Sequence, residues 1–149
     1  MPAPGDPAFE RRVRESFARQ SIMTTLGATL ERVAPGEVDV RLAFRHGLTQ
    51  QHGFLHAGVL TTIVDSACGY AALTLMPPEA AVLTVEFKVS LLAPGRGESF
   101  LARGRVLKHG RTLVFTSGEV LAEEAGVSRL VTTMTATVMT VRDRPGLAD

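Results

Sequence analysis

Residues 58–76, GVLTTIVDSACGYAALTLM, decide the fold. Apolar side chains recur along this stretch at helical spacing, and small residues cover much of the remaining surface. A helix that is apolar nearly all round is buried on most of its sides. The pair Pro77–Pro78 follows directly and stops the helix. The stretch therefore predicts a long helix, beginning at Gly58 and ending near Met76, at the centre of the protein.

The half of the chain after this helix is predicted to consist of strands. Apolar and polar residues alternate strictly from Leu83 to Leu91, and in the next stretch Phe100, Ala102 and Val106 alternate with Leu101, Arg103 and Arg105. Turns are expected at Pro94–Gly95, at His109–Gly110 and over residues 123–126. Two further strands, over residues 111–122 and 127–141, complete an antiparallel meander.

The residues before the long helix are predicted to form a short helix and then a hairpin. Asp6 is the expected N-cap of the short helix and Pro7 its first residue. Residues 25–33 are strand-like, residues 34–37 have the composition of a turn, and residues 38–44 alternate like a half-buried strand. Residues 46–55 have no period and are predicted to be a loop. The apolar stripe of the short helix consists of Phe9, Val13 and Phe17.

A long apolar helix needs a sheet to cover it, so the predicted fold class is α+β, with one antiparallel sheet curled round a central helix. The chain has 149 residues, which suits one domain. We expect an N-terminal helical arm over residues 1–20, the domain over residues 21–142 and a short tail over residues 143–149.

Composition excludes several classes of protein. Sixteen basic and fifteen acidic residues give a net charge of +1, which argues against nucleic-acid binding through bulk charge. The single cysteine, Cys68, excludes an internal disulfide, and we expect it to be a core residue. The four histidines lack the spacing of a metal site, so no metal is expected. Residues 1–20 contain no apolar leader, and we expect a cytoplasmic protein without a membrane span.

Asp65 is the candidate for chemistry. It is the only Asp, Glu, Lys or Arg between Arg45 and Glu79, and it lies midway along the most apolar helix. A carboxylate buried there costs several kcal/mol unless it faces a cleft, a partner or water. Taken alone, a structural role for Asp65 is the more common explanation.

The loop before the helix supplies further candidates. Residues 50–58, QQHGFLHAG, bring amide, imidazole and glycine together where the helix begins. A helix N-terminus offers free N–H groups and a partial positive charge, which can bind a carbonyl oxygen as negative charge develops on it. Taken singly, His56 is equally explained as a capping or loop-bracing residue, and Gln50 as a solvated amide.

These motifs resemble those of a known family. His56-Ala57-Gly58, followed by Asp65 and by Ser66-Ala67-Cys68-Gly69, is similar to the signature of hotdog-fold acyl-CoA thioesterases of the PaaI-like (phenylacetate-pathway) type. The order of the predicted elements also matches, over about residues 20–141. The resemblance implies a hotdog fold and an enzyme that hydrolyses an acyl-CoA to a free acid and coenzyme A. It implies no cofactor, since coenzyme A is part of the substrate.

The resemblance also implies roles for individual residues. Asp65 would be the general base that activates water, or the nucleophile, and the backbone N–H of Ala57 would polarise the thioester carbonyl. Gln50 would help to hold the reacting group or the water, and Thr84 would hold the water. Gly58 completes the motif, and His56 would brace the loop. The chain departs from the family at Ala57, where the usual residue is glycine; the N–H survives, but the added Cβ narrows the approach to it.

Helix geometry then predicts an oligomer. Ala57 and Asp65 are eight residues apart, which is about 12 Å along a helix. One thioester carbon cannot reach both, because reacting atoms must approach to within about 3.5 Å. If both residues act, they come from different protomers related by a two-fold axis. We therefore expect a homodimer, and from the resemblance a dimer of dimers.

The basic turn Lys108-His109-Gly110-Arg111 is either a solvated hairpin turn or a clamp for the phosphates of coenzyme A. Two other functions stay open at this point. One is a hotdog hydratase or dehydratase, and the other is a non-catalytic acyl-CoA-binding or sensing domain on the same fold.

Overall fold

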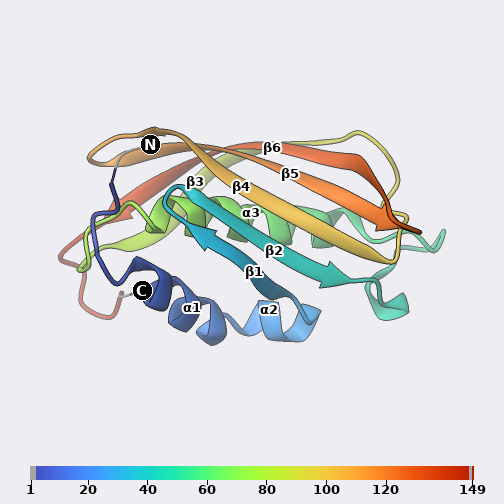
Figure 1. The fold of residues 1–149 in the computed structure, drawn as a ribbon, viewed down its shortest axis with the longest axis horizontal. Coiled ribbons are helices and arrows are strands. Elements are labelled where there is room, and N and C mark those ends of the chain that lie inside the picture. Colours follow the sequence, from blue (N-terminus) through green and yellow to red (C-terminus); the bar gives the residue numbers. More distant parts are fainter. Residues whose placement is uncertain (1–2, 148) are drawn as a thin grey trace.

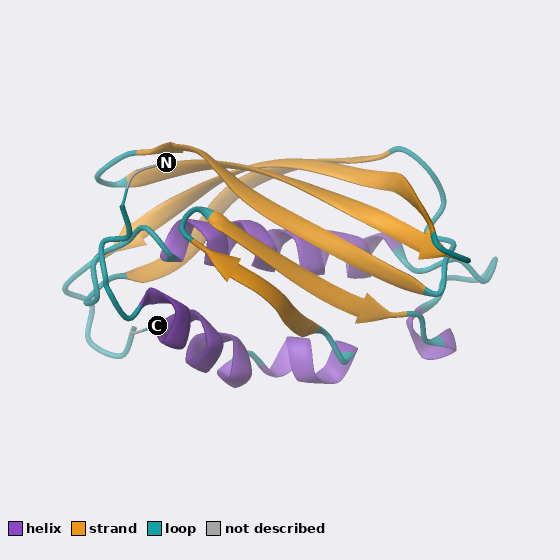
Figure 2. Cartoon of the chain, viewed as in Figure 1, coloured by secondary structure: helices purple, strands orange, loops and turns teal. Residues whose placement is uncertain are grey.

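A computed structural model describes residues 3–147 and residue 149. Six antiparallel strands form one sheet in the order β1-β2-β4-β5-β6-β3, and this sheet curls round the helix α3 (Figures 1 and 2). The predicted α+β class is confirmed. The elements are α1 (Phe9–Arg19), α2 (Ser21–Leu26), β1 (Thr29–Ala34), β2 (Glu37–Ala43), the 3-10 turn η1 (His46–Leu48), α3 (Ala57–Leu73), β3 (Ala81–Leu91), β4 (Ser99–His109), β5 (Leu113–Glu124) and β6 (Val127–Val141).

The predicted central helix is confirmed. Most of its residues are buried. The strands β4, β5 and β6 form the predicted meander, which packs against this helix. Alternate residues of β5 face the helix, and the residues between them face away. The side of the sheet that faces α3 is called the inner face below, and the opposite side the outer face.

Two glycines let the helix lie close to the sheet. Gly104 of β4 pairs with Gly118 of β5, directly below α3. A Cβ added at Gly104 would lie 2.2 Å from the carbonyl oxygen of Ala67, and one at Gly118 would lie 2.7 Å from Cys68 Sγ. Backbone therefore meets backbone at Gly104, and side chains of α3 lie against the bare backbone of Gly118, so the position of α3 over the sheet is fixed there.

The N-terminal part differs from the prediction in two places. The helix begins at Phe9 with Ala8 as N-cap, not at Pro7, because the Asp6 carboxylate accepts a bond from Ala8 N (2.8 Å) and closes a separate turn. A second helix, α2, occupies residues 21–26, where part of a strand was predicted. It ends at Gly27, whose φ of 73° is the left-handed conformation that terminates helices.

The helix α1 is held to the end of α3 by a buried cation. Arg12 is paired with Asp6, and its guanidinium donates to the carbonyl oxygens of Pro77 (2.9 Å) and Ala80 (2.8 Å). Val13 and Phe17, from the predicted apolar stripe, lie in the core. Figure 1 shows α1 and α2 lying along β1. Where the arm ends and the domain begins stays a prediction.

The close approach at Gly104 predicts a large effect from a small change. Gly104→Ala should lower the free energy of unfolding by about 1–3 kcal/mol, because the new methyl group pushes the Ala67 carbonyl away from the sheet. Urea denaturation measures the change. Gly47→Ala is the control, since a Cβ at Gly47 meets nothing within 4 Å. Equal stability of the two variants would contradict the proposed contact.

Candidate active site

Asp65 and Thr84 come together in one cavity. Thr84 lies on the inner face of β3, and its Oγ1 donates to Asp65 Oδ1 over 2.9 Å. The cavity has a volume of about 250 Å³. Its walls come from α3, from the first residues of β3 and from two distant segments; the residues are Gln20, Asp65, Ser66, Gly69, Tyr70, Val82, Leu83, Thr84 and Asp149.

The environment of Asp65 favours its protonated form. Partial burial raises the pKa of this carboxyl above its ordinary value, and the hydrogen bond from Thr84 lowers it by a smaller amount. A carboxylate with a raised pKa is a stronger base than one in water, and such shifts are common at catalytic sites.

The N-terminus of α3 carries the second group of predicted residues. His56 is the N-cap, and its Nδ1 accepts a bond from Gly58 N over 2.8 Å. The Gly58 amide is therefore occupied by His56. Ala57 is the first residue of the helix, and no hydrogen bond from its N–H to a described residue is found. Of these two amides, Ala57 is the one left to bind a ligand.

Gln50 and Ala57 line a second cavity, of about 460 Å³. Gln50 begins a tight turn in which its side-chain oxygen accepts from His52 N and its carbonyl oxygen accepts from Gly53 N. Gly53 has a φ of 82°, a conformation that favours glycine. The remaining walls are mostly apolar and come from Phe54, Leu55 and Leu60 and from residues 91–95 after β3.

The structure therefore separates the predicted residues into two halves within one chain. The Asp65 cavity and the Ala57 cavity share no residue. Both border β3, the first at residues 82–84 and the second at the end of the strand, from Leu91 onward. Neither half alone places a base and an oxyanion donor around one carbon.

The basic turn lies at the same end of the sheet as Thr84. The register runs from Thr84 through Val138 and Val114 to His109, which is three strand spacings or about 14 Å. Lys108, His109 and Arg111 are exposed. The predicted turn is confirmed, and its basic side chains are open to a ligand.

Cys68 is a core residue, as predicted. It is buried, and burial raises the pKa of its thiol to about 12, so it carries no thiolate near neutral pH. Across the described residues, no cluster of three or more His, Cys, Asp or Glu side chains could hold a metal ion. In the same part of the chain, every helix is too short or too polar to cross a membrane.

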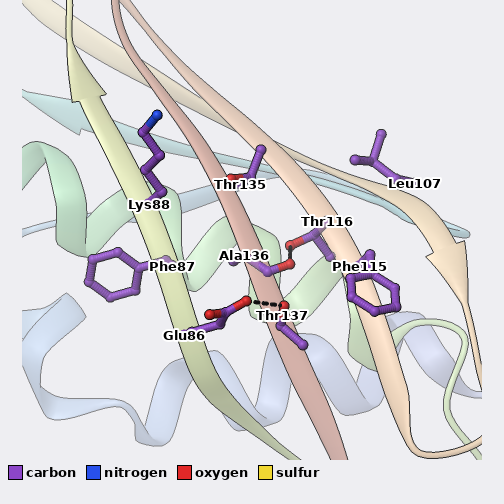
Figure 3. Close-up of a pocket in the computed structure, with 9 residues that line it drawn as sticks. All are labelled: Glu86, Phe87, Lys88, Leu107, Phe115, Thr116, Thr135, Ala136 and Thr137. Atoms are coloured by element: carbon purple, nitrogen blue, oxygen red, sulfur yellow. Dashed lines mark hydrogen bonds between the residues drawn. The ribbon is translucent and has the colours of Figure 1, made fainter.

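A third depression, shown in Figure 3, lies on the outer face and has a volume of about 280 Å³. It crosses β3, β6 and β5, with Phe115 at one side. Its one carboxylate, Glu86, accepts a hydrogen bond from Thr137 Oγ1 over 2.9 Å. None of the predicted site residues lies in this depression. The predicted residues Asp65, Thr84, Gln50 and Ala57 line the two cavities that border α3.

Several cavity residues were not predicted. Ser66 and Gly69 belong to the quoted helix motif. Ser66 is the neighbour of Asp65 and Gly69 lies one helical turn further on, and this spacing is the signal that could have identified them. Gln20 and Asp149 are far from Asp65 in the sequence and carry no local signal. Gln20 accepts a bond from Ser66 Oγ (3.1 Å), and Asp149 accepts one from Ser16 Oγ (2.9 Å).

Both the sequence and the fold of this chain match those of known proteins. The sequence profile of the thioesterase superfamily matches residues 52–129, which include the α3 motif and the basic turn. The chain belongs to the thioesterase superfamily. A human relative, acyl-coenzyme A thioesterase 13, is 31% identical over 99 residues, which are 66% of this chain and 70% of that protein.

Solved structures agree with this assignment. A thioesterase family protein from Silicibacter pomeroyi is 51% identical, covers 91% of this chain and 99% of its own, and superposes with a TM-score of 0.89. The PaaI protein of E. coli, from the phenylacetic acid degradation operon, superposes with a TM-score of 0.79 over 94% of this chain and 95% of its own, at 16% identity, and supports the fold alone. The predicted hotdog fold, the predicted family and the prediction of a thioester hydrolase are confirmed.

The raised pKa of Asp65 predicts that this thioesterase gains stability when the charge is removed. Asp65→Asn keeps an oxygen that can accept from Thr84, and it removes a partly buried charge, so the melting temperature at neutral pH should rise. The destabilisation by Asp65 sets in above the ordinary pKa, where the unfolded chain ionises, and is complete above the raised pKa of the folded protein. The gain should therefore shrink as the pH falls through that pKa, and vanish below the ordinary value of an aspartate.

Calorimetry at a series of pH values measures this difference. Glu124→Gln, at an exposed carboxylate outside both cavities, is the control and should show no such gain. An Asp65→Asn protein that melts below the wild type at neutral pH would show that the charge is stabilised, contrary to this account.

Proposed function

We propose that this thioesterase hydrolyses an acyl-CoA and that Asp65 is its catalytic carboxylate. The observation that carries the proposal is the Asp65–Thr84 pair, a carboxylate with a raised pKa that opens into a cavity on an otherwise uncharged helix. The human relative, acyl-coenzyme A thioesterase 13, supports acyl-CoA as the substrate class.

In the general-base form of the mechanism, the Asp65 carboxylate takes a proton from water, and the resulting hydroxide adds to the thioester carbon. The carbonyl oxygen becomes an oxyanion, which the Ala57 N–H stabilises. The intermediate collapses, the C–S bond breaks, and the thiolate leaves with the proton that Asp65 returns. In the nucleophile form, Asp65 itself attacks the carbon, the thiolate leaves, and water then cleaves the anhydride. If water attacks the Asp65 carbonyl carbon of the anhydride, a single turnover in ¹⁸O-water places the label in Asp65, which the general-base form never does.

The mechanism needs two protomers, and β3 is where we propose that they meet. β3 is an edge strand of eleven residues at one end of the sheet order. A long edge strand with free N–H and C=O groups is a template for another strand. A two-fold axis near the middle of β3 would bring the Asp65 cavity of one protomer to the Ala57 cavity of its partner, because the cavities border opposite ends of this strand.

The exposed apolar residues of β3 support the same interface. Leu83, Phe87 and Leu91 are 42%, 47% and 51% exposed, although all three are large. Phe87 pairs with Ala136 and Leu91 with Thr132, so both face the inner side, beyond the part that α3 covers. An uncovered apolar strip beside a buried helix suits a second copy of the chain. We propose that two such dimers then associate.

The basic turn is proposed to hold the phosphates of coenzyme A. Arg111 and Lys108 are exposed cations, and Arg in particular binds phosphate oxygens in pairs. The proposed reaction needs only water and the thioester, and no cofactor. The cytoplasm is the proposed compartment, since the one cysteine is free and a reducing environment suits it.

Two substitutions test the catalytic assignment. Asp65→Asn should reduce thiol release by about 10²–10⁴-fold, as expected for loss of a general base. Ala57→Pro should reduce it by about 10²–10³-fold, as expected for loss of an oxyanion donor. Proline removes the N–H but fits the first position of a helix, and His56, with φ −61° and ψ 137°, already has the backbone that precedes proline.

Thiol release from a panel of acyl-CoAs is the measurement, and Gly47→Ala is the control with unchanged activity. Wild-type binding of acyl-CoA without any thiol release would instead support the non-catalytic alternative. Near-normal rates in Asp65→Asn would refute the role of Asp65.

Mixing the two inactive proteins tests the shared site. In a hybrid dimer, one site combines Ala57 of the first chain with Asp65 of the second, and the other site carries both defects. Random exchange of equal amounts should restore about a quarter of the wild-type activity. Each variant mixed with itself is the control and stays inactive. If subunit exchange is verified by mass spectrometry and no activity returns, both residues belong to one protomer.

A further inference from the structure

Asp149 lies at one end of the Asp65 cavity, where distant parts of the chain hold it. Its Oδ1 accepts from Ser16 Oγ of α1 (2.9 Å), and its Oδ2 accepts from the backbone N of Val82 in β3 (2.6 Å). Ser16 is buried and also shares a hydrogen bond with the hydroxyl of Tyr70 of α3 (3.2 Å). One helix and one strand thus hold this carboxylate, and α3 holds the Ser16 hydroxyl through Tyr70.

The cavity runs along α3 and β3 between the two aspartates. Asp65 bonds Thr84, and Asp149 bonds Val82, two residues along the strand, or about 6.6 Å. Gly69 lies between them, one helical turn from Asp65, and a Cβ added there would meet no atom within 4 Å although the residue itself is buried. The space over Gly69 is therefore part of the cavity.

We propose that Asp149 closes the far end of the acyl cavity and limits the length of the acyl group. This inference rests on the proposed function, because it takes the cavity beside the catalytic carboxylate as the place of the acyl chain. The pantetheine arm of coenzyme A has to continue to the phosphates, whereas the acyl group ends. Asp149 and Tyr70 line this cavity, and a wall at that end suits the part of the substrate that ends.

Asp149 stands between the cavity and Ser16 of α1. Removal of the Asp149 carboxylate would therefore open the space towards Ser16, whose hydroxyl donates to it.

Two substitutions should move the length preference in opposite directions. Asp149→Ala removes the end wall, so the kcat/KM ratio of dodecanoyl-CoA to butanoyl-CoA should rise about tenfold. Gly69→Ala places a methyl group on the path of the longer chain, so the same ratio should fall about tenfold. The second variant is expected to fold well, because alanine is the better helix former and has room. Ser16→Ala, which removes one of the two donors to Asp149, should give a smaller rise.

The experiment measures kcat/KM for both substrates and Kd for their non-hydrolysable thioether analogues, with Glu124→Ala as the matched control. Amide hydrogen exchange at Val82 is read in parallel and should be faster in Asp149→Ala alone, since only that variant loses the acceptor of this N–H.

Wild-type thiol release with unchanged ratios in both variants would overturn the inference and leave the proposed function standing. Absence of thiol release from every substrate would refute the proposed function, and the Kd ratios would then decide the role of Asp149. Dissociation of Gly69→Ala into monomers with an unchanged length ratio would place Gly69 in an interface and also overturn the inference.

Discussion

The contact between the backbone of α3 and the glycine pair of the sheet is the constraint on which the site depends. Gly104 and Gly118 lie where Ala67 and Cys68 press on the strands. Each helical residue is rotated by about 100° from the one before, so this contact also fixes the direction of Asp65. With Ala67 and Cys68 turned towards β4 and β5, Asp65 faces β3 and meets Thr84. The sheet glycines therefore orient a carboxylate that they never touch.

Sequence reasoning succeeded where the pattern is local. The helix over α3, the meander and the basic turn follow from periodicity and turn residues within short windows. The pairing of Asp65 with Thr84 was anticipated only through the family resemblance. The predicted strict alternation puts Thr84 on the same side of the strand as Glu86, and this was wrong, because the register shifts between the two residues and Thr84 faces α3 while Glu86 lies on the outer face. The predicted start of the hairpin was wrong because Gly27, the residue that ends α2, was not recognised as a helix stop.

The walls of the cavity are the part that sequence could not supply. Gln20 and Asp149 line the Asp65 cavity from segments that are 45 and 84 positions away along the chain. Ordinary polar residues at such separations carry no period and no spacing, so only the folded chain reveals them. His56 illustrates the intermediate case, because capping was weighed from the sequence and the structure shows the cap, in which His56 Nδ1 accepts from Gly58 N.

The buried Arg12 has a consequence for the order in which the chain folds. Its guanidinium loses water to carbonyl oxygens that lie 64 to 68 residues further along the sequence. During synthesis α1 emerges long before those acceptors exist, and a desolvated cation without partners is unfavourable. The helix can therefore seat itself only after α3 and the Pro77–Ala80 segment have been made. Docking of α1 on the domain is therefore a late step in folding, and it requires that the central helix has already been completed.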